Sequence, residues 1–416
     1  MKIKVIVLLL FAMIMLAIVG EAQVPKPKFR RVAQRMPDNY IVVFKDTVST
    51  ADVPSIARQI ASAHNSVARF IYQYALKGFA VQVSEADAIE ISNDSRVEWV
   101  EEDAVGSIVE QWGLDRIDQR YLPLDNVYSF WQLAANVNIY VLDTGIRATH
   151  SEFGGRVVSA FDAVQANCYC GFTCDNAFAA TRGHGTAVAS VASGATYGVI
   201  RNATLYDVRV VNCDGGVDSA KLISGINWVT QNFVGPAVAN ISSAIAANDS
   251  VDTAVRNSAA AGVLYVVGAG NDSTDAIGYS PARMADIEVL TVGATDIVDR
   301  RGHDWDPQNP IKGSNWGSVV DIFAPGTNIN VAWSDSDSDT RTGINGTSLA
   351  SPYVAGVAAH YKQQHPGASP TTVANWIIGI ATSGVVTDQR PDGWILGIDQ
   401  VHPGTPNRLL FQPFSF

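Results

Sequence analysis

Short apolar runs separated by polar residues give the first quarter of the chain an alternating pattern. Runs at Tyr40–Phe44, Gly78–Val83 and Val97–Val100 predict strands. Helical periodicity over 54–65 and a second helical stretch opening at Ser84 predict two helices between them. The order strand, helix, strand, helix, strand predicts a small α+β unit.

The pattern changes after Trp112, where apolar runs alternate with stretches rich in Ala, Gly and Ser. The runs that predict strands are Val137–Leu142, Leu205–Val211, Ala237–Ile241, Val263–Val267 and Glu288–Val292. Each run is almost continuously apolar, as in strands that are buried on both faces. We therefore expect an α/β domain with a mostly parallel, doubly wound sheet and helices on both faces. In such sheets, ligands bind beyond the carboxyl ends of the strands.

The N-terminus has the pattern of a secretory signal. A basic start, Met1–Lys4, precedes the uncharged run Val5–Gly20, and small residues follow at Gly20 and Ala22. We expect cleavage after Ala22 and a secreted chain that has no membrane contact afterwards. A retained membrane anchor is the alternative, although the run is short for about 30 Å of hydrocarbon.

Charge narrows the classes of partner. Only 17% of the 416 residues are charged, which excludes a disordered or coiled-coil chain. Residues 1–108 hold 12 Lys/Arg and 12 Asp/Glu, whereas residues 109–416 hold 17 and 28 and so carry the whole net charge of −11. Such a surface repels phosphate backbones and anionic lipids, so we expect neither nucleic acid nor a membrane surface as a partner.

The cysteines fit an oxidising compartment. Cys168, Cys170, Cys174 and Cys213 are even in number, which favours disulfides in a secreted chain. Cys168 and Cys170 are too close in sequence to pair with each other, so one of them would bond Cys174 or Cys213. Zinc is the alternative ligand, but no histidine lies at ligand spacing within the cluster.

Three short motifs each contain a side chain that could take part in catalysis. Asp143 ends a predicted strand before Thr-Gly, His184 opens a small-residue helix inside Gly-His-Gly-Thr, and Ser348 begins another helix. Taken singly, they could be a turn residue, a helix-capping residue and an N-cap. Together they supply a nucleophile, a base and a group that orients the base.

The chemistry explains why these residue types occur together. His184 would take the proton of Ser348 and later return it, while Asp143 holds one imidazole tautomer and stabilises its cation. Asn271 follows the strand Val263–Val267 behind two glycines and could present its amide to a developing oxyanion. Alone, Asn271 could equally be a turn residue.

The motifs together resemble those of subtilisin-like serine proteases, most closely the proteinase K group. The matching segments are Asp143–Gly145, Gly183–Thr186, Val266–Asn271, Gly346–Pro352, Trp112–Arg120 and Val319–Gly326. The resemblance runs from about residue 38 to about residue 385. It implies a subtilisin-like α/β catalytic domain preceded by a small ferredoxin-like α+β pro-domain.

The resemblance also implies domain limits and roles. Residues 1–22 would be the signal peptide, 23–108 an inhibitory and chaperoning pro-segment and 109–416 the peptidase domain, with self-cleavage between Ala104 and Gln111. Ser348 would be the nucleophile, His184 the general base, Asp143 its orienting partner and Asn271 the oxyanion donor. The product would be a secreted, monomeric serine endopeptidase made as a zymogen, with its own pro-segment as an intramolecular inhibitor.

Substrate and metal sites follow from the same resemblance. Extended polypeptides would bind beside residues 212–217 and 241–246, and the residues in contact would be Ser242, Ser243, Ala244 and Gly215. Catalysis would need no cofactor. Asp321 would hold a structural calcium ion with backbone oxygens near 287–289, unless it is only a turn residue. Asp335, Asp337 and Asp339 begin like a calcium loop but lack its Gly and closing Glu, which favours a solvated loop.

Several positions depart from the family pattern. The family's Ser-Leu-Gly-Gly-Gly strand corresponds here to Ser242–Ala246, where Ala244 and Ile245 should narrow the primary side-chain pocket. Ala187 replaces a second histidine, and the segment Gly302–Lys312 resembles an insertion. By the family's pattern Cys174 would pair with Cys213, although Cys174 lies further from His184 than the related cysteine does.

Two rival functions stay open at this stage. The altered strand would suit a catalytically weak or inactive secreted binding protein on the same scaffold. An ester hydrolase could use the same three residues. Asn271 also lies in a glycosylation sequon, which must stay unused if the amide serves an oxyanion.

Overall fold

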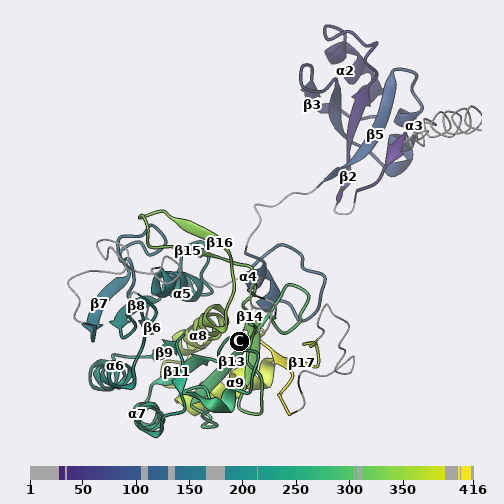
Figure 1. Ribbon diagram of the computed structural model, residues 1–416. Helices are drawn as coiled ribbons and strands as arrows, with labels where there is room; N and C mark the ends of the chain where they lie inside the picture. Colours follow the sequence, from purple (N-terminus) through teal and green to yellow (C-terminus); the bar gives the residue numbers. More distant parts are fainter. Residues whose placement is uncertain are drawn as a thin grey trace, which may run out of the picture. The chain divides into compact units, whose positions relative to one another are not determined.

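The computed structural model describes residues 28–32, 35–104, 111–129, 136–164, 183–212, 214–303, 305–306, 312–388, 402 and 404–413. The chain divides into two compact units, Met1–Ile108 and Val109–Phe416 (Figure 1). The expected signal peptide, the cysteines and most of the expected cleavage segment lie outside the described residues. No helix in the described part of the chain is long and apolar enough to cross a membrane.

In its described residues, the first unit is a five-stranded sheet with two helices. Its elements are β1 (Phe29–Arg30), β2 (Arg35–Phe44), α2 (Val53–Ala63), β3 (Ala68–Tyr72), β4 (Gly78–Gln82), α3 (Glu85–Ser92) and β5 (Val97–Ala104). The strand order is β1-β5-β2-β4-β3; only the β1–β5 pair is parallel. The predicted α+β unit is therefore confirmed, but β1 and β3 were not predicted.

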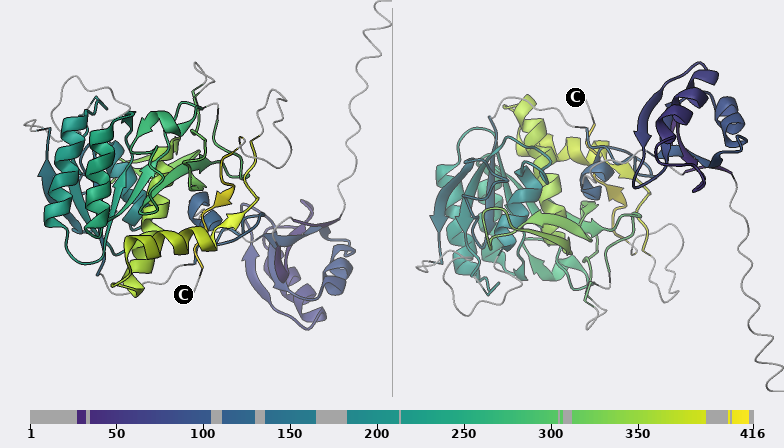
Figure 2. Two further views of the ribbon diagram at one scale, coloured as in Figure 1. Left: turned by 90° about the horizontal axis from the view of Figure 1, so that it is seen from below. Right: turned by 90° about the horizontal axis from the view of Figure 1, so that it is seen from above.

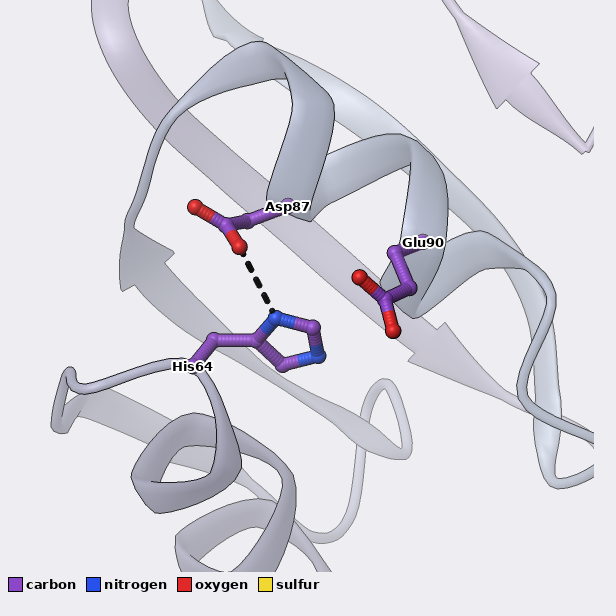
Figure 3. Close-up of side chains that lie close together, drawn as sticks. All are labelled: His64, Asp87 and Glu90. Carbon is purple, nitrogen blue, oxygen red and sulfur yellow. Dashed lines mark hydrogen bonds and ion pairs between the residues drawn. The ribbon is translucent and has the colours of Figure 1, made fainter.

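The two helices of this unit are held together by polar side chains as well as by the core. α2 buries Val53, Ala57 and Ile60, spaced so that they share one face of the helix. Figure 3 shows His64, which ends α2, reaching Asp87 in α3, with Nδ1 3.1 Å from Oδ1. Glu90 lies one turn further along α3 beside the same ring.

The second unit is built on a nine-stranded sheet. In spatial order its strands are β17 (Thr382–Ser383), β18 (Arg408–Leu409), β14 (Ile322–Pro325), β13 (Val289–Thr295), β11 (Leu264–Gly268), β9 (Ala237–Ile241), β6 (Asn138–Asp143), β8 (Thr204–Arg209) and β7 (Val157–Asp162). All neighbours are parallel except β17 and β18. The predicted parallel, doubly wound sheet is confirmed.

Helices cover both faces of this sheet, which is why its strands are apolar throughout (Figures 1 and 2). One face packs against α4 (Trp112–Ile117), α5 (His184–Ser193), α8 (Thr347–Gln364) and α9 (Pro370–Ile380). The other face packs against α6 (Ser219–Asn232) and α7 (Asp249–Ala260). In β6, for example, Ile139 and Val141 enter the first core, while Tyr140 and Leu142 enter the second.

Short elements outside the main sheet complete the unit. β10 (Ile245–Ala246) pairs with β12 (Tyr279–Ser280), and β15 (Ile329–Ala332) pairs with β16 (Thr340–Ile344), both antiparallel. A single 3₁₀ turn, η1 (Ala276–Gly278), precedes β12. The pairing of β10 shows that the altered segment Ser242–Ala246 leaves the main sheet and joins a separate two-stranded ribbon.

Candidate active site

The candidate residues meet at the carboxyl ends of three neighbouring central strands. Asp143 is the last residue of β6, Ser242 follows β9, and Asn271 follows β11 by a short turn. The helices α5 and α8 begin at the same edge, with His184 and Ser348 in their first turns. Because parallel strands end on the same side of a sheet, segments more than two hundred residues apart come together here.

Asp143 and His184 form a directed pair. His184 Nδ1 lies 2.8 Å from Asp143 Oδ1, and the carboxylate is buried, with 1% of its side chain exposed. The same Oδ1 accepts the Thr144 backbone N–H at 2.7 Å, which fixes the carboxylate. An Nδ1–H that donates to Asp143 leaves Nε2 as the basic nitrogen of the ring.

The electrostatics of this pair favour the charged imidazole. Burial of the His184 ring lowers its pKa, but the charge of Asp143 and the hydrogen bond to it outweigh that effect, so the net pKa is raised. Such a ring accepts a proton readily at neutral pH and holds it while chemistry proceeds.

The glycines on both sides of His184 are required by close packing. A Cβ at Gly183 would lie 2.4 Å from Trp333 Cδ2, and one at Gly185 would lie 2.5 Å from the Gly145 carbonyl oxygen. The second contact is with backbone, which cannot move aside. The Gly-His-Gly motif therefore lets α5 approach the turn after Asp143 closely enough for the 2.8 Å bond.

Ser348 lies in the first turn of α8, and its hydroxyl is held by main chain. Ser348 Oγ donates to the Ser242 carbonyl oxygen at 3.0 Å. A hydroxyl has one hydrogen, so in this conformation it is not donated to His184. The Ser348 proton is therefore directed at the Ser242 carbonyl.

Asn271 has its amide oriented by Thr347. Its Oδ1 accepts both the Thr347 backbone N–H and the Thr347 hydroxyl, each at 2.9 Å. Its Nδ2 then faces Ser348 across Gly346, where a Cβ would lie 3.7 Å from both Asn271 Nδ2 and Ser348 Cβ. The amide N–H and the start of α8 thus supply donors beside the Ser348 hydroxyl.

The four residues expected to bind substrate differ in how much of their side chain or backbone is available to a ligand. Ser242 Oγ is buried in bonds to Asn240, to the Ser348 carbonyl and to Ser351, so its side chain ties β9 to α8 rather than facing a ligand. The Ser242 carbonyl instead accepts the Ser348 hydroxyl, and the Ala244 side chain is half-buried. Ser243 Oγ is buried and has no hydrogen-bond partner among the described residues. Gly215 lies in an exposed turn with φ +84°, bonded only locally.

Asp321 lies apart from these residues, at the amino end of β14. Its Oδ2 accepts the Thr291 backbone N–H at 2.8 Å. Burial raises the pKa of this carboxyl to about 7, against the opposing effects of that hydrogen bond and of Arg408. In the loop near 337, Asp337 pairs with Arg147 at 2.6 Å and Asp335 with Arg341 at 2.8 Å.

Sequence reasoning missed several polar neighbours of the site. Thr347 belongs to the motif Gly346–Pro352, but its role in orienting Asn271 is visible only in the structure. Asp272, next to Asn271, pairs with Lys312 and accepts the Tyr279 hydroxyl at 3.0 Å. The hydrogen bond from Lys312 lowers the pKa of Asp272, and the weaker effect of the Tyr279 hydroxyl acts in the same direction. Thr347 and Lys312 lie far along the chain from Asn271 and Asp272, so no sequence spacing could have joined these pairs.

Comparisons with known proteins agree with the geometry. A family model described as "Subtilase family" matches residues 134–394, and one described as "Peptidase inhibitor I9" matches residues 39–108. An extracellular serine proteinase of Thermus sp. (strain Rt41A) is 42% identical over 349 residues, covering 83% of this chain and 77% of that one. An alkaline serine exoprotease A of Vibrio alginolyticus is 38% identical, covering 90% and 67%.

A solved structure is similar in fold as well. The crystal structure of a cold adapted subtilisin-like serine proteinase aligns with a TM-score of 0.62 and 39% identity, covering 73% of this chain and 98% of that one.

Proposed function

Because this chain belongs to the subtilase family of serine proteases, we propose that Asp143, His184 and Ser348 are its catalytic triad and Asn271 its oxyanion donor. The protein is a subtilisin-like serine endopeptidase with an inhibitory pro-segment of the I9 type. The 2.8 Å bond between His184 Nδ1 and Asp143 Oδ1, at the strand edge where Ser348 and Asn271 also lie, carries the assignment of roles.

The reaction follows from the positions of these groups. Ser348 Oγ attacks the scissile carbonyl carbon as His184 Nε2 takes its proton, and the charge of Asp143 stabilises the imidazolium. The oxyanion accepts hydrogen bonds from Asn271 Nδ2 and from the Ser348 backbone N–H. His184 then gives its proton to the leaving amine, and a water deprotonated by the same ring hydrolyses the acyl-enzyme.

Substrate binding and maturation are further parts of the proposal. A substrate main-chain N–H could take the Ser242 carbonyl, which would free the Ser348 hydroxyl that now donates to it. We propose residues 1–22 as the signal of a secreted protein, consistent with relatives named as extracellular. Residues 23–108 would then be the pro-segment, cleaved between Ala104 and Gln111 to release a monomeric enzyme.

Self-processing tests these roles directly. We would express the full chain, its Ser348→Ala variant and a control, Ser224→Ala, whose exposed hydroxyl bonds only within α6. The wild type and the control should lose the pro-segment, while Ser348→Ala stays joined to it. Equal processing of all three would contradict self-cleavage by Ser348. If none is processed and none cleaves unfolded protein, the binding-protein alternative gains support.

We also propose that Asp321 holds a structural calcium ion with backbone carbonyls of residues 287–289. Among the described residues the carboxylate has a single backbone N–H partner, and burial raises its pKa to about 7, so its negative charge is incompletely compensated. A bound cation would compensate it, and calcium prefers oxygen ligands. Arg408 donates to the Asp321 backbone carbonyl at 3.3 Å and Thr291 N–H donates to Oδ2, so Oδ1 is the carboxylate oxygen that would meet the ion.

Unfolding temperature tests the metal site. Chelation should lower the unfolding temperature of the Ser348→Ala chain, and calcium should restore it. Adding Asp321→Asn should remove part of that response, whereas the control Asp335→Asn, in a pair already taken by Arg341, should not. An unchanged calcium response with Asp321→Asn would contradict the site.

A further inference from the structure

Asp272 is a carboxylate that the proposed mechanism does not use, although it directly follows the proposed oxyanion donor, Asn271. Side chains from two other segments bind its two oxygens. Lys312 Nζ donates to Oδ1, and the Tyr279 hydroxyl donates to Oδ2 at 3.0 Å. These donors lie 40 and 7 residues away along the chain. The carboxylate therefore joins three parts of the chain beside the proposed reacting centre.

The main chain around Asn271 is bound to the segment that begins at Lys312. The Gly313 backbone N–H donates to the Asn271 carbonyl oxygen at 3.0 Å. Two residues further on, Asn315 Oδ1 accepts the Asp272 backbone N–H at 2.9 Å. Segment 312–315 therefore sets the position of the main chain that carries the Asn271 side chain.

Tyr279 connects the same carboxylate to the ribbon of β10 and β12. It is the first residue of β12, where it pairs with Ala246 of β10. β10 ends the segment 242–246, which we propose as part of the substrate-binding site. Asp272 is thus bonded to a residue of the ribbon on one side and to Lys312 on the other.

The amide of Asn271 needs support at both of its ends. Thr347 of α8 holds the amide oxygen through two bonds of 2.9 Å, and segment 312–315 holds the main chain. Rotation of the amide and displacement of its main chain are therefore restrained separately. Because an oxyanion donor works only within about 2.7–3.1 Å of the developing charge, a small shift of the main chain should weaken it.

We propose that Lys312 and Tyr279 are positioning residues for the oxyanion donor: they hold Asp272 from two sides and so fix the main chain from which the Asn271 amide projects. The inference rests on the role proposed above for Asn271. The Lys312 side chain is 42% exposed and that of Asp272 is 39% exposed, so their ion pair adds little to the free energy of unfolding. Its loss should therefore leave the fold intact and appear in catalysis.

A direct effect of charge is the alternative, and it predicts a different pattern. If Lys312 acted only through its positive charge, removal of the opposing charge of Asp272 would favour the oxyanion and raise kcat. If the two side chains act together to hold the main chain, removal of either one lowers kcat. The variants Lys312→Met and Asp272→Asn therefore differ in sign under the first explanation and agree under the second.

Steady-state kinetics of the mature enzyme on an uncharged peptide substrate test the proposal. Lys312→Met and Asp272→Asn should each lower kcat by about three- to fivefold with little change in KM. Lys312→Arg should retain most of the activity, and Tyr279→Phe, which loses only the hydroxyl, should lower kcat by about twofold. The matched control is Lys221→Met, which breaks an exposed pair with Asp218 in α6 and should keep the kcat of the wild type.

A double-mutant cycle shows whether the effect passes through the Asn271 amide. Lys312→Met is introduced into Asn271→Ala, which has no amide left to position, and kcat should fall no further. A side chain that only supports the structure in general would lower kcat by the same factor in both backgrounds. That additive result would overturn the proposal, as would a raised kcat in Asp272→Asn.

NMR keeps the proposal testable if a variant fails to mature. In the Ser348→Ala chain, the side-chain amide signals of Asn271 are identified by their loss in Asn271→Ala. They should shift with Lys312→Met and stay in place with Lys221→Met; unchanged signals in Lys312→Met would overturn the positioning role.

These measurements also separate this inference from the proposed function. Normal kcat in Lys312→Met beside an impaired Asn271→Ala would contradict the inference alone. Normal kcat in Asn271→Ala, or a wild type without peptidase activity, would contradict the proposed function itself.

Discussion

At the scale of single residues, the site depends on side chains that are oriented before substrate binds. Asn271 is the clearest case, because both acceptor bonds of its Oδ1 go to Thr347 at 2.9 Å. The amide cannot turn over without losing these bonds, so its N–H group stays directed at the Ser348 side of Gly346. Preorganised donors of this kind need no rearrangement when charge develops.

Replacing Asn271 should therefore reduce turnover more than binding. We expect Asn271→Ala to lower kcat by about two to three orders of magnitude with little change in KM. Asn271→Asp is the matched variant, because it keeps an acceptor for Thr347 but no amide donor, and it should be similarly impaired. Steady-state kinetics on a peptide substrate would measure both, and near-normal kcat in Asn271→Asp would contradict the donor role.

A buried histidine makes stability depend on pH. His360 has 2% of its surface exposed, and burial lowers its pKa to about 4. Gln412 Oε1 lies 3.1 Å from the Tyr128 hydroxyl, so the amide N–H group points at His360 Nδ1, 3.2 Å away. That contact suits the neutral ring and opposes a proton on Nδ1.

Acid should therefore destabilise the fold through His360. The unfolded chain takes up this proton near pH 6.5, and the folded chain only near pH 4. The contribution of the neutral His360 ring to the free energy of unfolding is complete above pH 6.5. It is lost as the pH falls toward 4, by up to about 3 kcal/mol. Unfolding of the Ser348→Ala chain as a function of pH should decline less with His360→Gln added; parallel curves would contradict this.

At the scale of elements, most of the regular structure was predictable. Runs buried on both faces gave β6, β8, β9, β11 and β13 within a few residues. The strands that escaped prediction are β1, β3, β7, β14, β17, β18 and the short ribbons β10–β12 and β15–β16. β7 and β3 have partly exposed side chains and mixed composition, because they lie at the edges of their sheets. An edge strand obtains its conformation from its neighbour rather than from its own pattern.

Helix α3 of the pro-domain shows how a local signal is used. Ser84 Oγ accepts the Asp87 backbone N–H at 3.2 Å and donates to Asp87 Oδ2 at 2.5 Å, while Asp87 Oδ1 meets His64. The N-cap predicted at Ser84 therefore also holds the carboxylate that links α3 to α2 (Figure 3).

Removing this cap should destabilise the pro-domain. We expect Ser84→Ala to cost about 1 kcal/mol of its unfolding free energy, measured by hydrogen exchange in the Ser348→Ala chain. Ser62→Ala, at an exposed position in α2, is the control and should be neutral or slightly stabilising. Equal protection of α3 in the two variants would contradict the capping role.

At the scale of the whole molecule, charge is distributed unevenly. Residues 109–416 carry 17 Lys/Arg and 28 Asp/Glu, so the peptidase unit has a negative field around it. Cationic polypeptides should meet this unit faster than anionic ones.

We expect kcat/KM for a Lys-flanked peptide to exceed that for a Glu-flanked peptide with the same residues around the cleaved bond. The ratio should shrink as salt shortens the screening length to about 8 Å at physiological ionic strength. Rates measured for both peptides over a salt series would check this. A ratio that does not change with salt would show that the preference arises in the cleft and not from the field.

The sequence by itself determined the fold class, the two-part organisation of the described chain and the motif residues Asp143, His184, Asn271 and Ser348. Short stretches of sequence carry each of these signals: an uninterrupted apolar run marks a strand that is buried on both faces, and a polar residue beside glycines marks a candidate site residue. Only the tertiary structure decided which groups meet. The Ser348 bond to Ser242, the orientation of Asn271 by Thr347 and the bond between His184 and Asp143 all join residues from different elements. Such contacts depend on strand order and register in a parallel sheet, which local sequence does not encode.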